Sequence, residues 1–486
     1  MVRRSLAVIV ALCIYPLFTN AQIQRTEALG GLSYSILDRD MSLSPYNFGN
    51  NPAWLSMDEK EDFLKIQPSV SSLWGDYKRK YDAERVNDYG ISFTGVKTLG
   101  EKGTFYGSTE YTYEMRKDYY KTIRKEPYAG DAFNILDSAS GDFRYNGPNI
   151  KLMYSWELFP NLYAGGYFFY HMLDGLKQTY SYSKTIYRNT GGGLGLAYCL
   201  SDNLVLGASL EYFNEQEAIE SEDINQIGIE SYIYRGESYY ITKSGTSEEQ
   251  KIKASGVNFS GQLYWDAGEN LKIGLQANYE PSDSKILIPN DETDEEEFED
   301  CYASFESYDA QLKLQYSVAD VVIGAYCGFF HDDSWTRITA KDVLIWDWNT
   351  DRIAAGIGSS YKITNNLLVG AEYELTNSDI DSSKYIDRKS NEFTSMCHTV
   401  KVGLEYEVTG NVFLRTGYNY CFEEHDLLFG GIDVSYNAFT LGMGYYLLDW
   451  CTLDAYIGYA RRSPGEISNY NRSNISGVVT LTLNSF

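Results

Sequence analysis

Eight short polar breaks along this chain each join two strand-like segments that follow one another directly. The breaks fall at residues 99–103, 159–161, 201–203, 267–270, 319–320, 364–366, 409–411 and 448–450. Longer connections rich in Tyr, Ser, Asp and Glu separate the joined pairs. Short turns on one side and long loops on the other are typical of an up-and-down β-barrel in an outer membrane.

The segments between these breaks alternate between apolar and polar residues with a period of two. One example runs over residues 204–213, where Leu, Leu, Ala, Leu and Tyr alternate with Val, Gly, Ser, Glu and Phe. An apolar set facing lipid and a polar set facing a wet lumen would produce this pattern. A large secreted β-sandwich or β-helix also alternates, but it needs neither such uniform hairpins nor aromatic residues near apolar strand ends.

The count of alternating segments predicts an all-β, transmembrane, antiparallel up-and-down barrel of about 18 strands, with short periplasmic turns and long extracellular loops. The expected strands are 63–73, 88–98, 103–116, 146–157, 161–173, 180–199, 204–216, 252–266, 271–283, 302–317, 321–332, 351–363, 367–376, 395–407, 411–424, 437–447, 451–462 and 473–486. Fourteen or sixteen strands would result if 63–73 or 351–363 folded differently. Closure is expected because lipid offers no hydrogen-bond partner to an open sheet edge.

The N-terminus has the features of a secretory signal. Arg3 and Arg4 precede an apolar stretch over residues 6–18, and a small residue, Ala21, ends the segment. We therefore divide the chain into a signal peptide (1–21), an N-terminal periplasmic or luminal segment (22–61) and a transmembrane barrel (62–486). The expected location is the cell outer membrane, where lipid, lipopolysaccharide and the barrel-assembly machinery are the expected partners.

Composition excludes several classes of function. The chain carries 41 basic and 67 acidic residues, a formal net charge of −26, so a nucleic-acid partner is not expected. Cysteines at 199, 301, 327, 397, 421 and 451 form no CxxC pair, which argues against zinc. We interpret them as small residues packed in the wall, with disulfides as the alternative. The acidic run 291–300 reads as a solvated loop tip rather than a calcium site.

Residues 22–61 do not read as a free tail. Pro45, Pro52 and repeated Asn and Gly rule out a long helix or a central strand. The aromatic residues Phe48 and Trp54 are nevertheless too apolar for an exposed coil. The segment is therefore expected to fold back into the lumen as a small hatch, with Asn51, Pro52, Ala53 and Trp54 as its candidate residues.

Asn51-Pro52-Ala53 followed by an apolar residue resembles the Asn-Pro-Ala segment near the N-terminus of fatty-acid-transporter-type (FadL-like) outer-membrane barrels. Relatives of that family in Bacteroidota secretion systems (PorV-like) share the segment, and the whole chain resembles uncharacterised outer-membrane barrels of Bacteroidota. The resemblance implies an N-terminus that lines the lumen as a hatch and hydrophobic cargo that crosses. That family has fewer strands than are counted here.

No pattern in the sequence indicates catalysis. The four histidines, His171, His331, His398 and His425, lie on or beside four different expected strands. A Ser-His pair on the outer wall is the alternative, but no spacing supports it. The chain is expected to be no enzyme and to have no cofactor and no metal.

Charged residues of both signs fall in the set expected to face the lumen. The candidates are Glu110, Glu114, Lys272, Lys313, Glu372, Glu374, Lys401, Arg415 and Asp454. A wall of this kind favours a passive channel or transporter for small solutes or hydrophobic compounds, without sharp ion selectivity. The alternative is a structural or accessory barrel that docks a surface lipoprotein, a receptor or a secretion-system partner.

Overall fold

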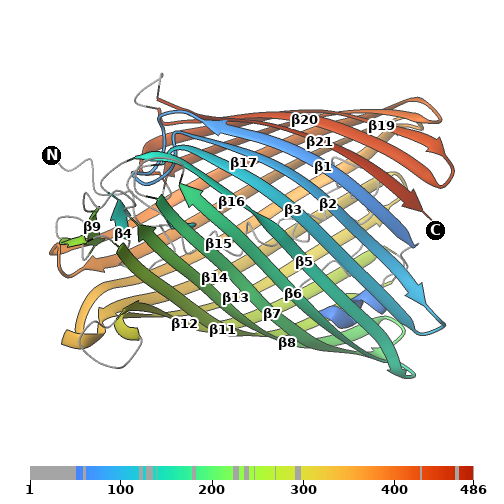
Figure 1. Ribbon diagram of the computed structural model, residues 1–486. Coiled ribbons are helices and arrows are strands. Elements are labelled where there is room, and N and C mark those ends of the chain that lie inside the picture. Colours follow the sequence, from blue (N-terminus) through green and yellow to red (C-terminus); the bar gives the residue numbers. More distant parts are fainter. Residues whose placement is uncertain are drawn as a thin grey trace.

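Eighteen strands form one closed antiparallel barrel in the computed structural model (Figure 1). The structure describes residues 51–57, 62–119, 124–126, 135–137, 140–177, 182–222, 229–234, 240–245, 247–268, 270–289, 297–426, 429–465 and 470–484. The expected signal peptide, most of the expected hatch and part of the acidic run 291–300 lie outside these ranges.

Each strand of the barrel pairs with the next strand along the wall. The strands are β1 (Phe63–Trp74), β2 (Arg85–Leu99), β3 (Gly103–Tyr119), β5 (Gly141–Phe159), β6 (Leu162–Lys177), β7 (Tyr182–Ser201), β8 (Leu204–Glu222), β11 (Ser247–Asp266), β12 (Leu271–Pro289), β13 (Glu297–Val318), β14 (Val321–Ile338), β15 (Val343–Thr364), β16 (Leu367–Lys384), β17 (Lys389–Thr409), β18 (Val412–His425), β19 (Ile432–Leu448), β20 (Cys451–Ser463) and β21 (Arg472–Asn484). Pairing of β1 with β21, from Phe63 opposite Asn484 to Trp74 opposite Ser473, closes the cylinder. The predicted fold class, the strand count and the eight tight turns are thus confirmed.

Three short strands and two short helices complete the described structure. Strands β4 (Ile135–Asp137), β9 (Ile229–Tyr234) and β10 (Tyr240–Gly245) form a separate three-stranded sheet. This sheet joins the β3–β5 connection to the β8–β11 connection at the end of the barrel that carries the long loops (Figure 1). The two 3₁₀ helices are η2 (Pro52–Ser56) and η3 (Thr339–Lys341). Among the described residues, no helix is long and apolar enough to cross a membrane.

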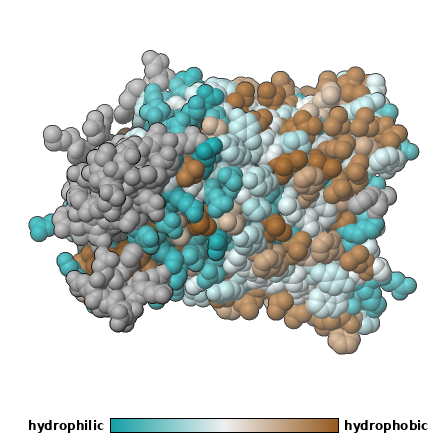
Figure 2. Space-filling view, in the orientation of Figure 1, coloured by the Kyte–Doolittle hydropathy of each residue, from teal (hydrophilic) through white to brown (hydrophobic). Residues whose placement is uncertain are grey.

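The two ends of the barrel differ in construction. The eight tight turns, the start of β1 and the end of β21 all lie at one end, which we call the turn end. The long connections lie at the other, the loop end. In the half of the barrel next to the turns, large apolar side chains point outward; Leu194, for example, is 69 % exposed. Figure 2 shows this apolar surface near the turn end and a hydrophilic zone closer to the loop end.

Toward the loop end the polarity of the two faces is reversed. On β12, outward-facing Leu275 lies in the apolar half, whereas Ile286, nearer the loops, faces inward and is 1 % exposed. Its outward-facing neighbour Lys285 is exposed. Similar inward side chains form a buried apolar cluster along the wall: Phe143, Tyr145, Leu173, Tyr187, Ile219, Ile252, Ile286, Ile345 and Trp346.

This reversal explains where the expected strand ends were wrong. Residues 333–350 and 377–394 look like polar loops, yet β14 and β15 continue to Ile338 and from Val343. Likewise β16 and β17 leave only four residues between Lys384 and Lys389. The strands stay paired beyond the apolar half of the barrel, but their outward side chains become polar there. The alternation expected of a lipid-facing strand therefore ends before the strand does.

Candidate functional site

All nine lumen candidates belong to the inward-facing set of their strands. The side chains that alternate with them, such as Tyr111, Leu275, Tyr373, Val402, Leu414 and Ile457, are the exposed outer ones. The structure therefore places Glu110, Glu114, Lys272, Lys313, Glu372, Glu374, Lys401, Arg415 and Asp454 on the inner wall. It brings only some of them together, and the groups they form differ in character.

Arg415 on β18 forms the most buried ion cluster near the turn end. Its Nε lies 2.7 Å from Glu405 Oε2 on β17, and its Nη1 lies 2.7 Å from Asp454 Oδ1 on β20. The guanidinium reaches Asp454 across β19 at Gly444, where a Cβ would approach Asp454 Oδ1 to 2.8 Å. Removing one partner of a buried ion pair leaves an uncompensated charge, so this cluster ties β17, β18 and β20 together rather than offering a free charge.

The other candidates are more dispersed. Lys401 Nζ lies 3.7 Å from Glu372 Oε2 on the neighbouring strand β16. Glu110, Lys272, Lys313 and Glu374 stand on four different strands, β3, β12, β13 and β16. Charges of both signs are thus spread around the inner wall.

A patch of carboxylates and amides on β8, β11, β12 and β13 was not among the sequence candidates. Asn258 Nδ2 donates to Glu280 Oε2 at 2.7 Å, and Asn278 Nδ2 donates to both carboxylate oxygens of Asp309 at 3.0 Å. Glu211 accepts a hydrogen bond from Tyr167. The alternation of each strand places these residues in the lumen set, but only the register shows that they form one patch.

The described part of the expected hatch, residues 51–57, includes all four candidates, Asn51–Trp54, which lie against the inner wall near the turn end. Asn51 caps η2, with its Oδ1 accepting from the Ala53 amide at 3.0 Å, and Pro52 occupies the first position of the helix, where its missing N–H costs nothing. Asn51 Nδ2 donates to the wall carbonyls of Leu196, at 2.9 Å, and Ala208, at 3.3 Å.

Trp54 and Ala53 complete this anchor, by which we mean residues 51–56. Trp54 Nε1 donates to Gln262 Oε1 on β11 at 2.6 Å, and Ser155 Oγ on β5 donates to the Ala53 carbonyl at 3.2 Å. Both residues are buried against Ala197, Val205 and Tyr264. Four polar contacts and a small apolar cluster therefore fix the anchor to β5, β7, β8 and β11.

Glycines in the wall make room for the anchor. A Cβ at Gly195 would come within 2.0 Å of Asn51 Oδ1, and one at Gly165 within 2.6 Å of the Pro52 carbonyl carbon. The backbone of β7 must therefore be bare at Gly195, where Asn51 approaches.

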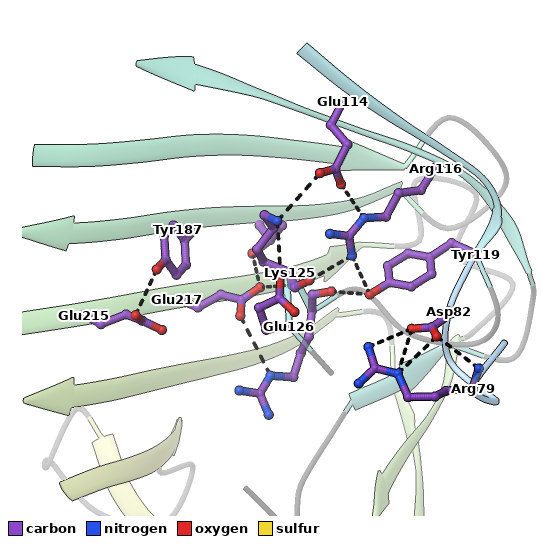
Figure 3. A network of polar contacts seen from close by, with 12 residues as sticks. Arg79, Asp82, Glu114, Arg116, Tyr119, Lys125, Glu126, Tyr187, Glu215 and Glu217 are labelled. Atoms are coloured by element: carbon purple, nitrogen blue, oxygen red, sulfur yellow. Dashed lines mark hydrogen bonds and ion pairs between the residues drawn. The ribbon is translucent and has the colours of Figure 1, made fainter. Parts of the chain in front are cut away.

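Near the loop end, residues 124–126 of the β3–β5 connection fold against the inner wall (Figure 3). The Lys125 amide donates to Glu217 Oε1 on β8 at 2.6 Å, and Thr185 Oγ1 on β7 donates to the same oxygen at 2.9 Å. Arg124 Nε lies 3.8 Å from Glu217 Oε2, and these two residues are 2 % and 4 % exposed. One carboxylate thus holds the connection to two strands.

The opposite side of the same segment is held by β3. Arg116 contacts Glu114 and donates through Nη1 to the Lys125 carbonyl at 2.8 Å. The Tyr119 hydroxyl donates to the Arg124 carbonyl at 2.6 Å, and Lys125 Nζ lies 3.2 Å from Glu126 and 3.7 Å from Glu114. Burial lowers the pKa of Lys125, but Glu114 and Glu126 outweigh it and the pKa is raised overall. The lysine is therefore charged at neutral pH.

The described residues hold no group of three or more His, Cys, Asp or Glu side chains placed to bind a metal ion. Two histidines make outward-facing contacts: His331 Nδ1 lies 2.7 Å from Asp351 Oδ1, and His398 Nδ1 lies 2.8 Å from the Tyr373 hydroxyl.

The fold and this wall define the class: a closed barrel with an apolar outer band and a polar, charged inner wall, the construction of outer-membrane barrels. The chain belongs to the family of unknown function DUF6850, whose model matches residues 52–320. No curated protein is similar in sequence.

Several solved structures are distantly similar. The siderophore receptor PiuA from Acinetobacter baumannii is 12 % identical, with 87 % of this chain and 82 % of that chain covered and a TM-score of 0.44. The Pseudomonas putida toluene transporter TodX is 13 % identical, with 94 % and 97 % covered and a TM-score of 0.35. The Ralstonia pickettii toluene transporter TbuX is 11 % identical, with the same coverage and a TM-score of 0.34. The resemblance to FadL-like barrels and the Bacteroidota origin stay predictions.

Proposed function

We propose that the chain is an outer-membrane barrel that acts as a passive channel or transporter for small solutes. The observation that carries this proposal is the inner wall of the apolar half, where carboxylates, amides and basic groups line a closed 18-stranded cylinder. Barrels with about 16 to 18 strands are wide enough to leave an aqueous channel. The outer apolar band supports the location, since a soluble barrel would not expose it.

The acidic patch of Glu211, Glu280 and Asp309 supports small polar or cationic solutes in this half of the lumen. The apolar cluster near the loop end is almost fully buried and offers little surface to a hydrophobic compound, so that solute class rests on the resemblance to FadL-like barrels alone. Small polar or cationic solutes are therefore the first proposed class, and hydrophobic compounds are the second. We assign no catalytic role to the wall and no cofactor.

Conductance of the purified full-length protein in a planar lipid bilayer tests the proposal. We expect discrete conductance steps with a weak preference for cations. Glu280→Lys adds a positive charge to the inner patch and should move the reversal potential in a salt gradient toward anions. Asp283→Lys is the matched control, because it makes the same charge change on the outward face of the same strand and should leave the reversal potential unchanged.

A protein that inserts but never conducts would overturn the channel proposal. So would equal effects of Glu280→Lys and Asp283→Lys, because the inner wall would then not be the path of the ions.

An accessory role is the second candidate, favoured by the β4–β9–β10 sheet. This sheet joins two long connections outside the barrel wall, and such a platform suits docking of a surface lipoprotein, receptor or secretion partner. Extraction in mild detergent followed by affinity purification tests this role. A stoichiometric partner that is lost when residues 229–245 are replaced by a short Gly-Ser linker would support it, and a barrel that emerges alone would contradict it.

A further inference from the structure

Two cysteines lie side by side on the inner wall. Cys397 on β17 and Cys421 on β18 have their sulfur atoms 3.0 Å apart, although 24 residues separate them in the chain. The register pairs Cys421 with Thr399 and Cys397 with Glu423, so the two cysteines are diagonal neighbours on one face. Both side chains are partly accessible.

The other four cysteines show no such arrangement. Cys199, Cys301, Cys327 and Cys451 stand on β7, β13, β14 and β20. Of these strands only β13 and β14 are neighbours, and there Cys301 lies opposite Ile338, far along β14 from Cys327. The Cys301 thiol instead donates to the Arg337 carbonyl at 2.8 Å. The pair on β17 and β18 is therefore distinct from the remaining thiols.

The surroundings hold the pair in place. Glu423, which faces Cys397 across the two strands, accepts from Arg462 Nη2 on β20 at 2.6 Å. Arg462 Nε also lies 2.7 Å from Asp426 Oδ2, to which the Tyr77 hydroxyl donates at 2.7 Å. These contacts tie the loop end of β18 to β20 and to Tyr77.

We propose that Cys397 and Cys421 are a redox site that forms a disulfide across the inner wall. A covalent S–S bond is about 2.05 Å long and requires side chains on the same face, so the two sulfur atoms, now 3.0 Å apart, need to approach by about 1 Å. The availability of an oxidant depends on the proposed outer-membrane location, since compartments outside the cytoplasm supply disulfide-bearing oxidants.

The reaction is a thiol–disulfide exchange. One cysteine thiolate attacks a sulfur of the oxidant's disulfide, forms a mixed disulfide and expels one thiolate of the oxidant. The second cysteine thiolate then attacks the first cysteine's sulfur, closes the Cys397–Cys421 bond and expels the other thiolate. Two protein thiols are oxidised, one disulfide of the oxidant is reduced to two thiols, and the two protons released by the cysteines pass to those thiols.

Alkylation of the full-length protein tests the site. The barrel is purified from outer membranes without reductant, incubated with oxidised glutathione, denatured, alkylated with N-ethylmaleimide and mapped by mass spectrometry. We expect peptides containing Cys397 and Cys421 to be joined and unalkylated, and both to become alkylated after reduction. In Cys397→Ser the remaining Cys421 should be alkylated or carry glutathione. Cys199→Ser is the control and should leave the joined peptides unchanged.

Alkylation of both Cys397 and Cys421 in the oxidised wild-type protein would overturn the proposal. Joining of either cysteine to Cys199 or Cys301 would overturn it as well. The readout is a covalent bond and does not depend on conductance, so a barrel that fails to conduct can still carry the disulfide, and a conducting barrel can lack it.

Discussion

The half of the barrel near the turns and the half near the loops use the same strands in opposite ways. Near the turns, apolar side chains face outward and polar groups line the wall. Near the loops, apolar side chains such as Ile286 and Tyr145 are buried inside, and charged residues such as Lys285 face out. The first arrangement suits lipid and the second suits water, so one continuous sheet serves two solvents.

The two halves also hold their inward segments differently. The anchor at the turn end uses neutral hydrogen bonds and bare glycine backbone. The 124–126 segment at the loop end uses ion pairs and charge-assisted hydrogen bonds around Glu217 and Arg116. A charged acceptor that is buried costs more to lose than a neutral one, so the loop-end contact should be the more sensitive to substitution.

The largest effect on stability is expected from replacing an apolar side chain of β12 by a charged one in each half of the barrel. Ile286→Asp places an unpaired charge among buried side chains and should lower the free energy of unfolding by about 4 kcal/mol or more. Leu275→Lys, on the outward face of β12 in the apolar half, should cost about 2 to 4 kcal/mol in a bilayer. Denaturant-induced unfolding in lipid vesicles, followed by tryptophan fluorescence, measures both.

Lys285→Asp is the control for this pair, because it introduces the same carboxylate at an exposed outward position next to Ile286. It loses only the exposed ion pair of Lys285 Nζ with Glu299 Oε2, at 3.1 Å, and should cost about 1 kcal/mol. If Ile286→Asp were tolerated as well as Lys285→Asp, the inner face near the loops would be wet, and the contrast between the two halves would disappear.

The second prediction concerns Glu217. Glu217→Ala removes the acceptor of the Lys125 amide and leaves buried Arg124 without this carboxylate, which should destabilise the local contact by about 3 kcal/mol. Hydrogen–deuterium exchange at residues 124–126 should rise by about two orders of magnitude, since each 1.4 kcal/mol is about tenfold. Glu126→Ala is the matched control, since the more exposed Glu126–Lys125 pair should contribute less than about 1 kcal/mol. Equal exchange in the two variants would contradict the central role of Glu217.

The third prediction weakens the turn-end anchor from the wall side. Gly195→Val introduces a Cβ where Asn51 Oδ1 lies and should displace the anchor, with a loss of about 2 to 3 kcal/mol from its hydrogen bonds. Gly261→Val is the control, because a Cβ there would meet no atom within 4 Å. Cysteine-specific labelling at an introduced Ser56→Cys reports release of the anchor. Unchanged labelling in Gly195→Val would mean that Asn51 does not dock on this wall.

These contrasts also show which features the sequence could predict. The eight turns and 18 strands were predictable, because polar breaks and period-two alternation are local signals. Strand ends near the loops were not, because there the outward residues are polar and strands resemble loops. The Glu217–Lys125 contact was also hidden, since it joins residues 92 positions apart through a loop that folds inward.

The candidate residues illustrate the same limit. Alternation places Arg415 and Asp454 on the inner face, but it cannot show that Arg415 reaches Asp454 across a glycine of the strand between them. The close approach of Cys397 and Cys421 likewise depends on the register of β17 and β18, which a period of two leaves undetermined.

The smallest effect is expected from a change in pH. The contact of residues 124–126 at the loop end should not act as a pH switch near neutrality. The pKa of Lys125 is raised, so its contribution to holding the segment is complete below the ordinary lysine pKa of about 10.4 and is lost only as pH rises through the higher folded value. Exchange at residues 124–126, corrected for its intrinsic pH dependence, should therefore be constant from about pH 7 to about pH 9. Lys125→Met should raise exchange equally at both pH values. A rise in wild-type exchange within this window would show that Glu114 and Glu126 do not hold the lysine in its charged form, and the loop-end contact would then depend on Glu217 and Arg116 alone.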